Sequence, residues 1–155
     1  MTVHIVGRWE WGYLSPMVEA NLWNLVMRDF DINEWWMNPV SGVRNNEERY
    51  VNLNERNHYQ DIMNDIDPTL QRVFLEPHTS TSTENPIWLH DFVHPENCVY
   101  VFGSAHYNPT IDTTVNREED IVVTIKTQND AGVLWSNQCL LTVLYDRYIK
   151  SLPGV

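Results

Sequence analysis

The sequence predicts an α/β protein with a mainly parallel sheet and helices on both of its faces. Apolar, β-branched runs of strand length recur along the chain, and segments of helical periodicity alternate with them. This alternation is typical of βαβ units and a parallel sheet. The clearest apolar run stops at Gly103. A glycine at the end of a buried strand is typical of the edge where such a protein forms a ligand crevice.

In the first part of the chain, the apolar run Val3 to Val6 predicts a buried strand bounded by Gly7. Ser15 and Pro16 form a cap and first-position pair, which predicts a helix from about Pro16 to Asp29. Its apolar residues at helical spacing are Val18, Leu22, Leu25 and Val26. Ile32 to Met37 is strand-like.

The middle of the chain is less regular. The pattern fades into polar and charged residues from Ser41 to Glu55, where we predict no element. A modest helix follows from Tyr59 to Ile66, and a strand from Leu70 to Leu75. The short run Ile87 to Phe92 fits either a strand or one turn of helix.

The last third carries the strongest signals. Cys98 to Phe102 predicts a fully buried strand, and Ile121 to Ile125 predicts another. Asn108-Pro109-Thr110 suits the start of a short helix. Leu134 to Lys150 predicts a long amphipathic helix. Its apolar positions include Leu141, Leu144, Tyr145 and Tyr148.

Composition bounds the class of protein. A length of 155 residues with 43% hydrophobic content suits one domain over residues 1–155. The formal net charge of -11 opposes non-specific attraction to nucleic-acid phosphates. Cys98 and Cys139 form no CxxC pair, so we expect a reducing cytoplasm rather than a disulfide framework. With no signal peptide and no apolar run of membrane-spanning length, we expect a soluble protein with no membrane partner.

The order of these elements, with Phe102-Gly103 closing a strand and Ser136-Asn137 at the head of the last helix, resembles the SPOUT superfamily of RNA methyltransferases. The nearest group is the SpoU-type tRNA ribose 2′-O-methyltransferases of single-domain size. The resemblance covers nearly the whole chain. It implies a C-terminal trefoil knot, bound S-adenosylmethionine or S-adenosylhomocysteine, a homodimer, and tRNA or another RNA as partner.

The resemblance also implies which loops hold the cofactor: residues 75–79, 102–105 and 125–135. Exposed backbone groups in such loops can recognise an adenine edge. The residues that it assigns to cofactor binding are Leu75, Glu76, Pro77, Phe102, Gly103, Ser104, Ile125, Thr127, Leu134, Trp135 and Asn137.

The family's polar motif residues are replaced in this chain. The arginine expected on the first helix falls near Trp23, and no arginine occurs between Pro16 and Met27. Ala105 follows Ser104 where the second motif carries a glutamate, and Gly132 and Leu134 occupy the serine and asparagine places of the third motif. Two hypotheses follow: a methyltransferase with substitute catalytic groups, or a catalytically inactive knotted dimer that acts as a cofactor sensor or protein-binding module.

Three residues are candidates for the substitute catalytic role. Arg8 ends the first strand, where the crevice of a parallel sheet opens, and it can replace the missing helix arginine or form a surface ion pair. If the family architecture holds, His78 and His106 lie in loops that meet at the same crevice. Either can act as a base near neutral pH, and either can equally be an exposed loop histidine.

Two other patterns carry candidate functions. His90 and His94 lie four residues apart with Asp91 between them, a spacing that suits a helical metal pair and a metal-dependent hydrolase. Pro95 disfavours a continuing helix there, so we assign no metal site. The chain has seven tryptophans, more than a small core usually needs, and we expect some of them at an interface.

Overall fold

The computed structural model describes residues 1–9, 16–32, 34–38, 52–103, 109, 117–129 and 134–154. Its centre is a seven-stranded sheet in the order β3-β2-β1-β6-β4-β7-β5. Every neighbouring pair is parallel. The strands are β1 (Thr2–Arg8), β2 (Glu34–Asn38), β3 (Leu53–Glu55), β4 (Gln71–Leu75), β5 (Ile87–Trp88), β6 (Asn97–Phe102) and β7 (Ile121–Thr124).

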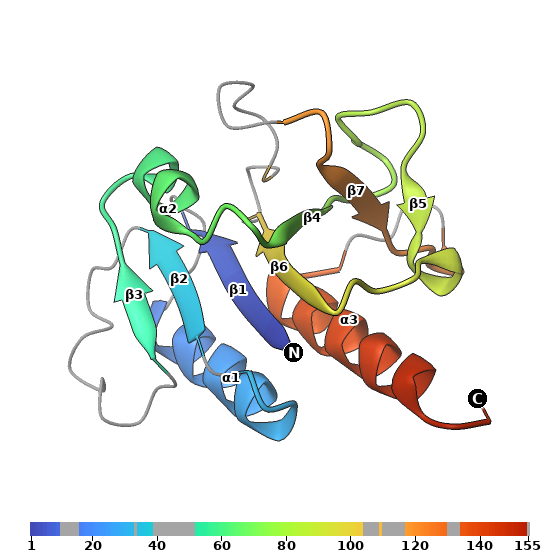
Figure 1. The fold of residues 1–155 in the computed structure, drawn as a ribbon, viewed down its shortest axis with the longest axis horizontal. Helices are drawn as coiled ribbons and strands as arrows, with labels where there is room; N and C mark the ends of the chain where they lie inside the picture. Colours follow the sequence, from blue (N-terminus) through green and yellow to red (C-terminus); the bar gives the residue numbers. More distant parts are fainter. Residues whose placement is uncertain are drawn as a thin grey trace.

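Helices cover both faces of this sheet. The helices are α1 (Pro16–Asp29), α2 (Tyr59–Asp65), α3 (Ser136–Ser151) and the 3-10 turn η2 (Leu89–Asp91). Figure 1 shows α1 and α3 on one side of the sheet and α2 on the other. The predicted α/β fold class is therefore confirmed. The trefoil knot stays an expectation from the resemblance.

Side chains of alternate strand residues enter two separate cores, because successive residues of a strand face opposite ways. The core beneath α1 and α3 contains Ile5, Trp35, Val73, Tyr100 and Val123. The core beneath α2 contains Val6, Trp36, Phe74, Val99 and Val101. Strands buried on both faces explain the continuous apolar runs in the sequence.

Tryptophans fill much of the core beneath α1 and α3. Trp23 packs edge-on against Trp9 and Phe102, with ring centroids 5.2 and 5.6 Å apart, and stacks on Trp35 at 6.1 Å. Trp36 is buried in the other core. These four tryptophans pack inside the monomer and are not available for an interface. The expectation that some of the seven lie at an interface stays a prediction for Trp88 and Trp135, and Trp11 lies outside the described residues.

Most of the apolar residues that predicted the two long helices do not pack on the sheet; Leu144 and Val26 are the exceptions. α1 buries Ala20, Trp23 and Met27, and α3 buries Leu140, Val143 and Leu144. The remaining apolar positions form an exposed apolar face, with each residue 43–57% exposed. Its members are Val18, Leu22 and Leu25 of α1 and Leu141, Tyr145 and Tyr148 of α3.

Most predicted elements occur where the sequence placed them. α1 has the predicted bounds, and residues 87–92 hold both proposed alternatives, since the short strand β5 runs directly into η2. β3 was not predicted. The helix proposed at Asn108-Pro109-Thr110 lies outside the described residues except for Pro109. Among the described helices, none is long and apolar enough to cross a membrane.

Candidate functional site

The carboxyl ends of the central strands carry a row of polar residues around one glycine. Arg8 pairs with Asn38 where β1 and β2 end. Gly103 and Glu76 directly follow Phe102 and Leu75, the last paired residues of β6 and β4. Thr124 directly follows Val123, which pairs with Leu75. We call these five residues the polar row. Its four side chains are at most 8% exposed. Ligands of parallel α/β sheets bind at this edge.

The polar side chains of the row share one face of the sheet. Each of the four lies two residues after a residue of the core beneath α2 or one that packs against it. Those residues are Val6, Trp36, Phe74 and Val122. Because side chains alternate along a strand, the row continues the α2 face at the edge of the sheet. The sheet therefore changes from apolar to polar at one level across its central strands.

Arg8 is held at the start of α2. Its guanidinium carbon lies 4.6 Å from the ring centroid of Tyr59. The Tyr59 hydroxyl donates a hydrogen bond of 2.6 Å to the Pro109 carbonyl. Arg8 is buried rather than at the surface, where the ion-pair alternative placed it. No sequence pattern marks Tyr59 as a functional residue. Its ring, at the first turn of α2, explains why an arginine can be buried here.

Two members of the row have polar atoms with no hydrogen-bond partner among the described residues. In the described part of the chain these are Thr124 Oγ1 and Asn38 Oδ1. A buried polar atom without a partner costs about 1–3 kcal/mol. Glu76 differs, because its Oε1 accepts hydrogen bonds from the Ser82 amide at 2.9 Å and the Ser82 hydroxyl at 2.6 Å. The Glu76 carboxylate thus fixes the loop that follows β4.

The amino end of α3 is tied to α1 through a buried carboxylate. Glu19 accepts hydrogen bonds from Trp23 Nε1 at 3.1 Å and Asn137 Nδ2 at 3.2 Å, and a longer one from the Ser136 hydroxyl at 3.4 Å. The positive end of the α3 dipole favours a carboxylate at this place. Glu19 was missed from the sequence. Its spacing of four residues from Trp23 and eight from Met27 places it on the buried face of α1 and is the signal that was available.

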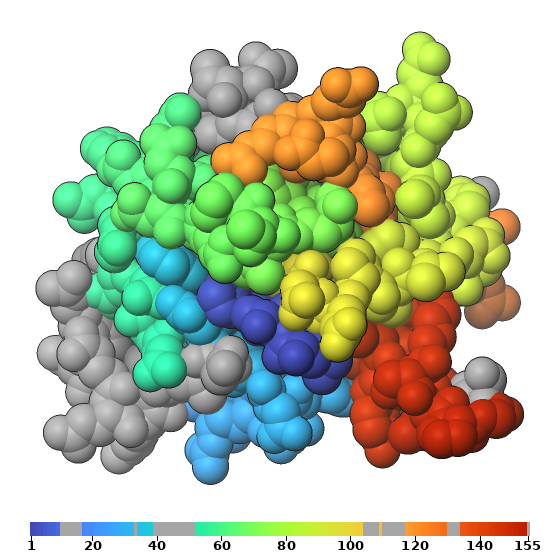
Figure 2. Space-filling view, in the orientation of Figure 1, coloured from blue at the N-terminus to red at the C-terminus, as the bar shows by residue number. Residues whose placement is uncertain are grey.

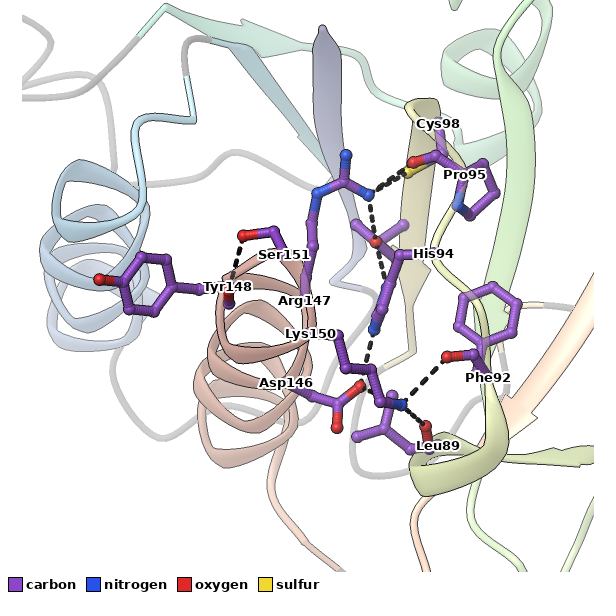
Figure 3. Close-up of polar contacts among 11 residues, drawn as sticks. Leu89, Phe92, His94, Pro95, Cys98, Asp146, Arg147, Tyr148, Lys150 and Ser151 are labelled. Atoms are coloured by element: carbon purple, nitrogen blue, oxygen red, sulfur yellow. Dashed lines mark hydrogen bonds and ion pairs between the residues drawn. The ribbon is translucent and has the colours of Figure 1, made fainter. Parts of the chain in front are cut away.

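The carboxyl-terminal half of α3 is anchored to β6 and η2 by a second polar cluster (Figure 3). Arg147 donates to the Tyr100 hydroxyl oxygen at 3.0 Å and to the Pro95 carbonyl at 2.6 Å. His94 lies 2.6 Å from that hydroxyl through Nδ1 and 2.7 Å from Asp146 through Nε2. A neutral His94 with its proton on Nε2 satisfies the whole chain of donors and acceptors. Burial lowers the pKa of His94, although the Asp146 carboxylate opposes this shift.

The predicted catalytic residues lie in different surroundings. Arg8 lies over Tyr59 at the α2 face, whereas the His78 ring lies 6.2 Å from that of Trp88 on the edge strand β5. β5 and β1 are separated by three strands in the sheet. The described contacts therefore do not bring Arg8 and His78 together. His106 lies outside the described residues.

The predicted cofactor residues fall into two groups. Leu75 pairs with Phe102, and the Glu76 amide donates to the Val123 carbonyl at 3.1 Å, so the ends of β4, β6 and β7 meet. Pro77, Gly103 and Ile125 directly follow these ends. The second group belongs to the start of α3: Leu134, Trp135 and Asn137, whose described contacts run to Gln138, Cys139 and Glu19. Thr127 bonds to the Asn129 carbonyl, and Ser104 lies outside the described residues.

Contacts within the fold account for His90, His94 and the two cysteines. Both ring nitrogens of His94 are hydrogen-bonded, and His90 lies 3.5 Å from its neighbour Asp91 at the surface. Within the described ranges, no group of three His, Cys, Asp or Glu residues could hold a metal ion. Burial raises the pKa of Cys98 and raises that of Cys139 to about 12, so both thiols stay protonated at neutral pH.

Sequence comparisons find no match, whereas solved structures of similar fold are found. No protein-family model matches the sequence. No curated protein matches it either. Among solved structures, the SpoU methyltransferase AviRb from Streptomyces viridochromogenes superposes with a TM-score of 0.69 at 11% identity, over 99% of this chain and 61% of that one. An AdoMet-bound rRNA methyltransferase from Sinorhizobium meliloti gives 0.67 at 12% identity, over 97% of this chain and 57% of that one.

A third structure, reported for the 2-OH methylation of C/U34 on tRNA, gives a TM-score of 0.63 at 12% identity. It is matched over 95% of this chain and 94% of its own length. The chain thus spans about three fifths of some of these proteins and nearly all of others. The proteins that it resembles in structure are SpoU/TrmH-family RNA methyltransferases. At these identities the likeness establishes the fold, which is the fold that the sequence resemblance implied.

Proposed function

We propose that this protein binds S-adenosylmethionine, or its product S-adenosylhomocysteine, against the polar row and the loops that follow β4, β6 and β7. The observation that carries the proposal is the polar row itself, at the sheet edge where α/β proteins bind ligands. The likeness to an AdoMet-bound rRNA methyltransferase of the same fold supports this choice of ligand.

The residues present suit such a ligand. Its adenine, ribose and amino-acid parts offer both donors and acceptors. The unpartnered Thr124 Oγ1 and Asn38 Oδ1 need hydrogen-bond partners of these kinds. Gly103, in the middle of the row, has no side chain to obstruct a close approach of the ligand to the backbone.

A substitution of Thr124 by valine tests cofactor binding. The change keeps the shape of a fully buried side chain and removes a hydroxyl that has no partner among the described residues, so stability should be equal or higher. Calorimetric titration with S-adenosylmethionine should show affinity lowered about fivefold or more. Thr142→Val, on the middle of α3, is the matched control. Absence of binding by the unaltered protein at millimolar ligand contradicts the cofactor proposal.

The fold neighbours support a second step, methylation of an RNA ribose 2′-hydroxyl, in tRNA or another RNA. When bound, S-adenosylmethionine supplies a methyl group to an oxygen nucleophile. The Arg8 guanidinium stabilises negative charge at that oxygen, and His106 accepts its proton. If His78 is the base instead, Arg8 takes no part in the same step, because three strands separate β1 from β5. Separate alanine variants of these three residues should reduce methyl transfer to a bulk tRNA pool while leaving cofactor affinity nearly intact. Unchanged transfer in all three contradicts these roles.

We also propose a homodimer formed through the exposed apolar face of α1 and α3. Adjacent helices that each expose an apolar stripe are typical of an interface. The variants Leu22→Glu and Tyr145→Glu should shift the mass measured by light scattering from dimer to monomer. Val93→Glu, at an 85% exposed position outside this face, is the matched control. A monomeric unaltered protein at micromolar concentration contradicts the dimer.

One observation favours the alternative of an inactive cofactor sensor or protein-binding module. The place near which the family carries its helix arginine is occupied by Trp23, whose ring is fully buried between Trp9, Trp35 and Phe102. Cofactor binding without methyl transfer to any RNA of a total cellular pool distinguishes this alternative from the methyltransferase. Transfer to any RNA excludes it.

A further inference from the structure

A cavity of about 390 Å³ lies at the amino ends of the strands, whereas the polar row lies at their carboxyl ends. It is formed where the turn at residues 68–70 and the amino ends of β4 and β6 meet residues 117–120, just before β7. Figure 2 shows these three segments, distant in sequence, side by side on one face: green for 68–72, yellow for 96–97 and orange for 117–120. Its volume lies within the usual range of small-ligand sites.

The base of the cavity holds a buried ion pair with a free carboxylate oxygen. Arg72 Nη2 lies 3.2 Å from Asp120 Oδ2, and the two side chains are only 3% and 7% exposed. Asp120 Oδ2 also accepts a 2.6 Å hydrogen bond from the Arg117 amide. Among the described residues, Asp120 Oδ1 has no partner. Burial raises the pKa of Asp120 and lowers that of Arg72, which indicates that the pair is incompletely compensated.

The lining has an excess of negative charge. Among the described lining residues, Glu96, Glu119 and Asp120 accompany two guanidinium groups, and that of Arg72 is already paired with Asp120. The net charge of -11 adds to the attraction for cations. Among the described residues, carboxylates do not come close enough in threes to hold a metal ion. Carboxylates too far apart for one metal ion can be spanned by an extended molecule with several N–H donors.

We infer that this cavity binds an aliphatic polyamine, with one ammonium group toward Asp120 and others toward Glu96 and Glu119. Each ammonium supplies the donors that carboxylates lack, as charge-assisted hydrogen bonds. The site is separate from the proposed cofactor site. Asp120 directly precedes β7, whereas Thr124 ends it, so the two sites lie at opposite ends of the same strand. The inference does not depend on the proposed function.

The test uses spermidine and the full chain, with calorimetric titration at 0.15 M salt. One molecule should bind per chain, whether or not S-adenosylmethionine is present. Glu119→Gln should weaken binding about three- to fivefold, as expected for loss of one partly exposed charge contact, and Glu96→Gln should have a similar effect. The matched control is Glu118→Gln, which removes the same charge from the adjacent exposed residue outside the lining.

Three outcomes overturn the inference. The first is no binding at millimolar spermidine. The second is an equal loss of affinity in Glu118→Gln and Glu119→Gln. The third is displacement of bound spermidine by added NaCl of the same ionic strength as the spermidine. The last two indicate diffuse attraction to an acidic surface. Asp120→Asn is a secondary variant, because loss of the charge also weakens the buried pair with Arg72. Its thermal stability is therefore measured together with its affinity.

Discussion

Replacement of Tyr100 by phenylalanine should destabilise the protein by detaching the carboxyl-terminal half of α3 from β6. The Tyr100 hydroxyl is buried and joins two residues, accepting from Arg147 at 3.0 Å and donating to His94 at 2.6 Å. Arg147 keeps the Pro95 and Glu96 carbonyls as acceptors, so its charge is not left unpaired. His94 Nδ1 loses its partner in a buried site. We expect a loss of about 2 kcal/mol in the free energy of unfolding.

For a chain of 155 residues, such a loss lowers the melting temperature by about 6 °C. The measurement is calorimetric or circular-dichroism melting at one fixed protein concentration, since a dimer would make the midpoint depend on concentration. Tyr145→Phe, whose ring is exposed on the same helix, should shift the midpoint by less than about 1 °C. A double-mutant cycle with Asp146→Asn should show coupling of at least about 0.5 kcal/mol through His94. Equal, small shifts for both phenylalanine variants would refute the role assigned to this cluster.

Three further predictions concern the core, the amino end of α3 and pH. Gly7→Ala should destabilise by about 1–3 kcal/mol, because a Cβ there would lie 2.6 Å from Trp9 Nε1 and 3.1 Å from Trp23 Cη2; urea unfolding checks this, and an unchanged midpoint contradicts the packing. Glu19→Ala should cost about 2–3 kcal/mol, because three donors lose their acceptor, and amide hydrogen exchange should become faster first at the start of α3; uniform faster exchange would argue against a local tie. Burial lowers the pKa of His94 below its ordinary 6.5, so the unfolded chain binds a proton more readily. The contribution of His94 to the free energy of unfolding is therefore fully present above about pH 6.5. It declines as the pH falls toward the lowered pKa of His94 in the folded protein. Asp146, Arg147 and Lys150 of α3 and Tyr100 of β6 face this histidine. The difference in unfolding free energy between the unaltered protein and His94→Gln should shrink from pH 7 to pH 5, and a constant difference would contradict this assignment.

The sequence predicted the framework well because its signals are local. Pro16 at the first turn defines the start of α1, and buried strands show as continuous apolar runs. The faces of the helices were harder to predict, since α1 and α3 each carry apolar residues on two sides. Val18, Leu22 and Leu25 show helical spacing as clear as that of the buried residues, and only the fold shows which face meets the sheet. Gly7 illustrates the same limit: it suggested the end of a strand, but β1 continues through it, and its missing side chain admits Trp9.

The polar row could not be predicted, because it depends on register between strands that are far apart in sequence. Asn38 falls just after the predicted strand Ile32 to Met37 and Thr124 lies inside another predicted strand, and neither has a local signature of a site. Arg8 is a candidate because it ends the first predicted strand, and Glu76 only because of the family resemblance. Only the parallel ladders reveal that these residues lie at one level beside Gly103.

The position of the polar row bears on whether replacement of the expected motif residues counts against ligand binding. Polar groups on or directly after strands are held by the sheet more rigidly than groups on long loops, and rigid placement is what binding and catalysis require. In this chain Arg8, Asn38 and Thr124 belong to strands, and Glu76 is fixed by Ser82 directly after one. A chain with the fold of SpoU-type methyltransferases, but without the polar loop residues that the resemblance leads us to expect, still carries four buried polar side chains at the carboxyl ends of its strands. Absence of the motif residues is therefore weaker evidence against ligand binding than it is against the family's usual catalytic chemistry.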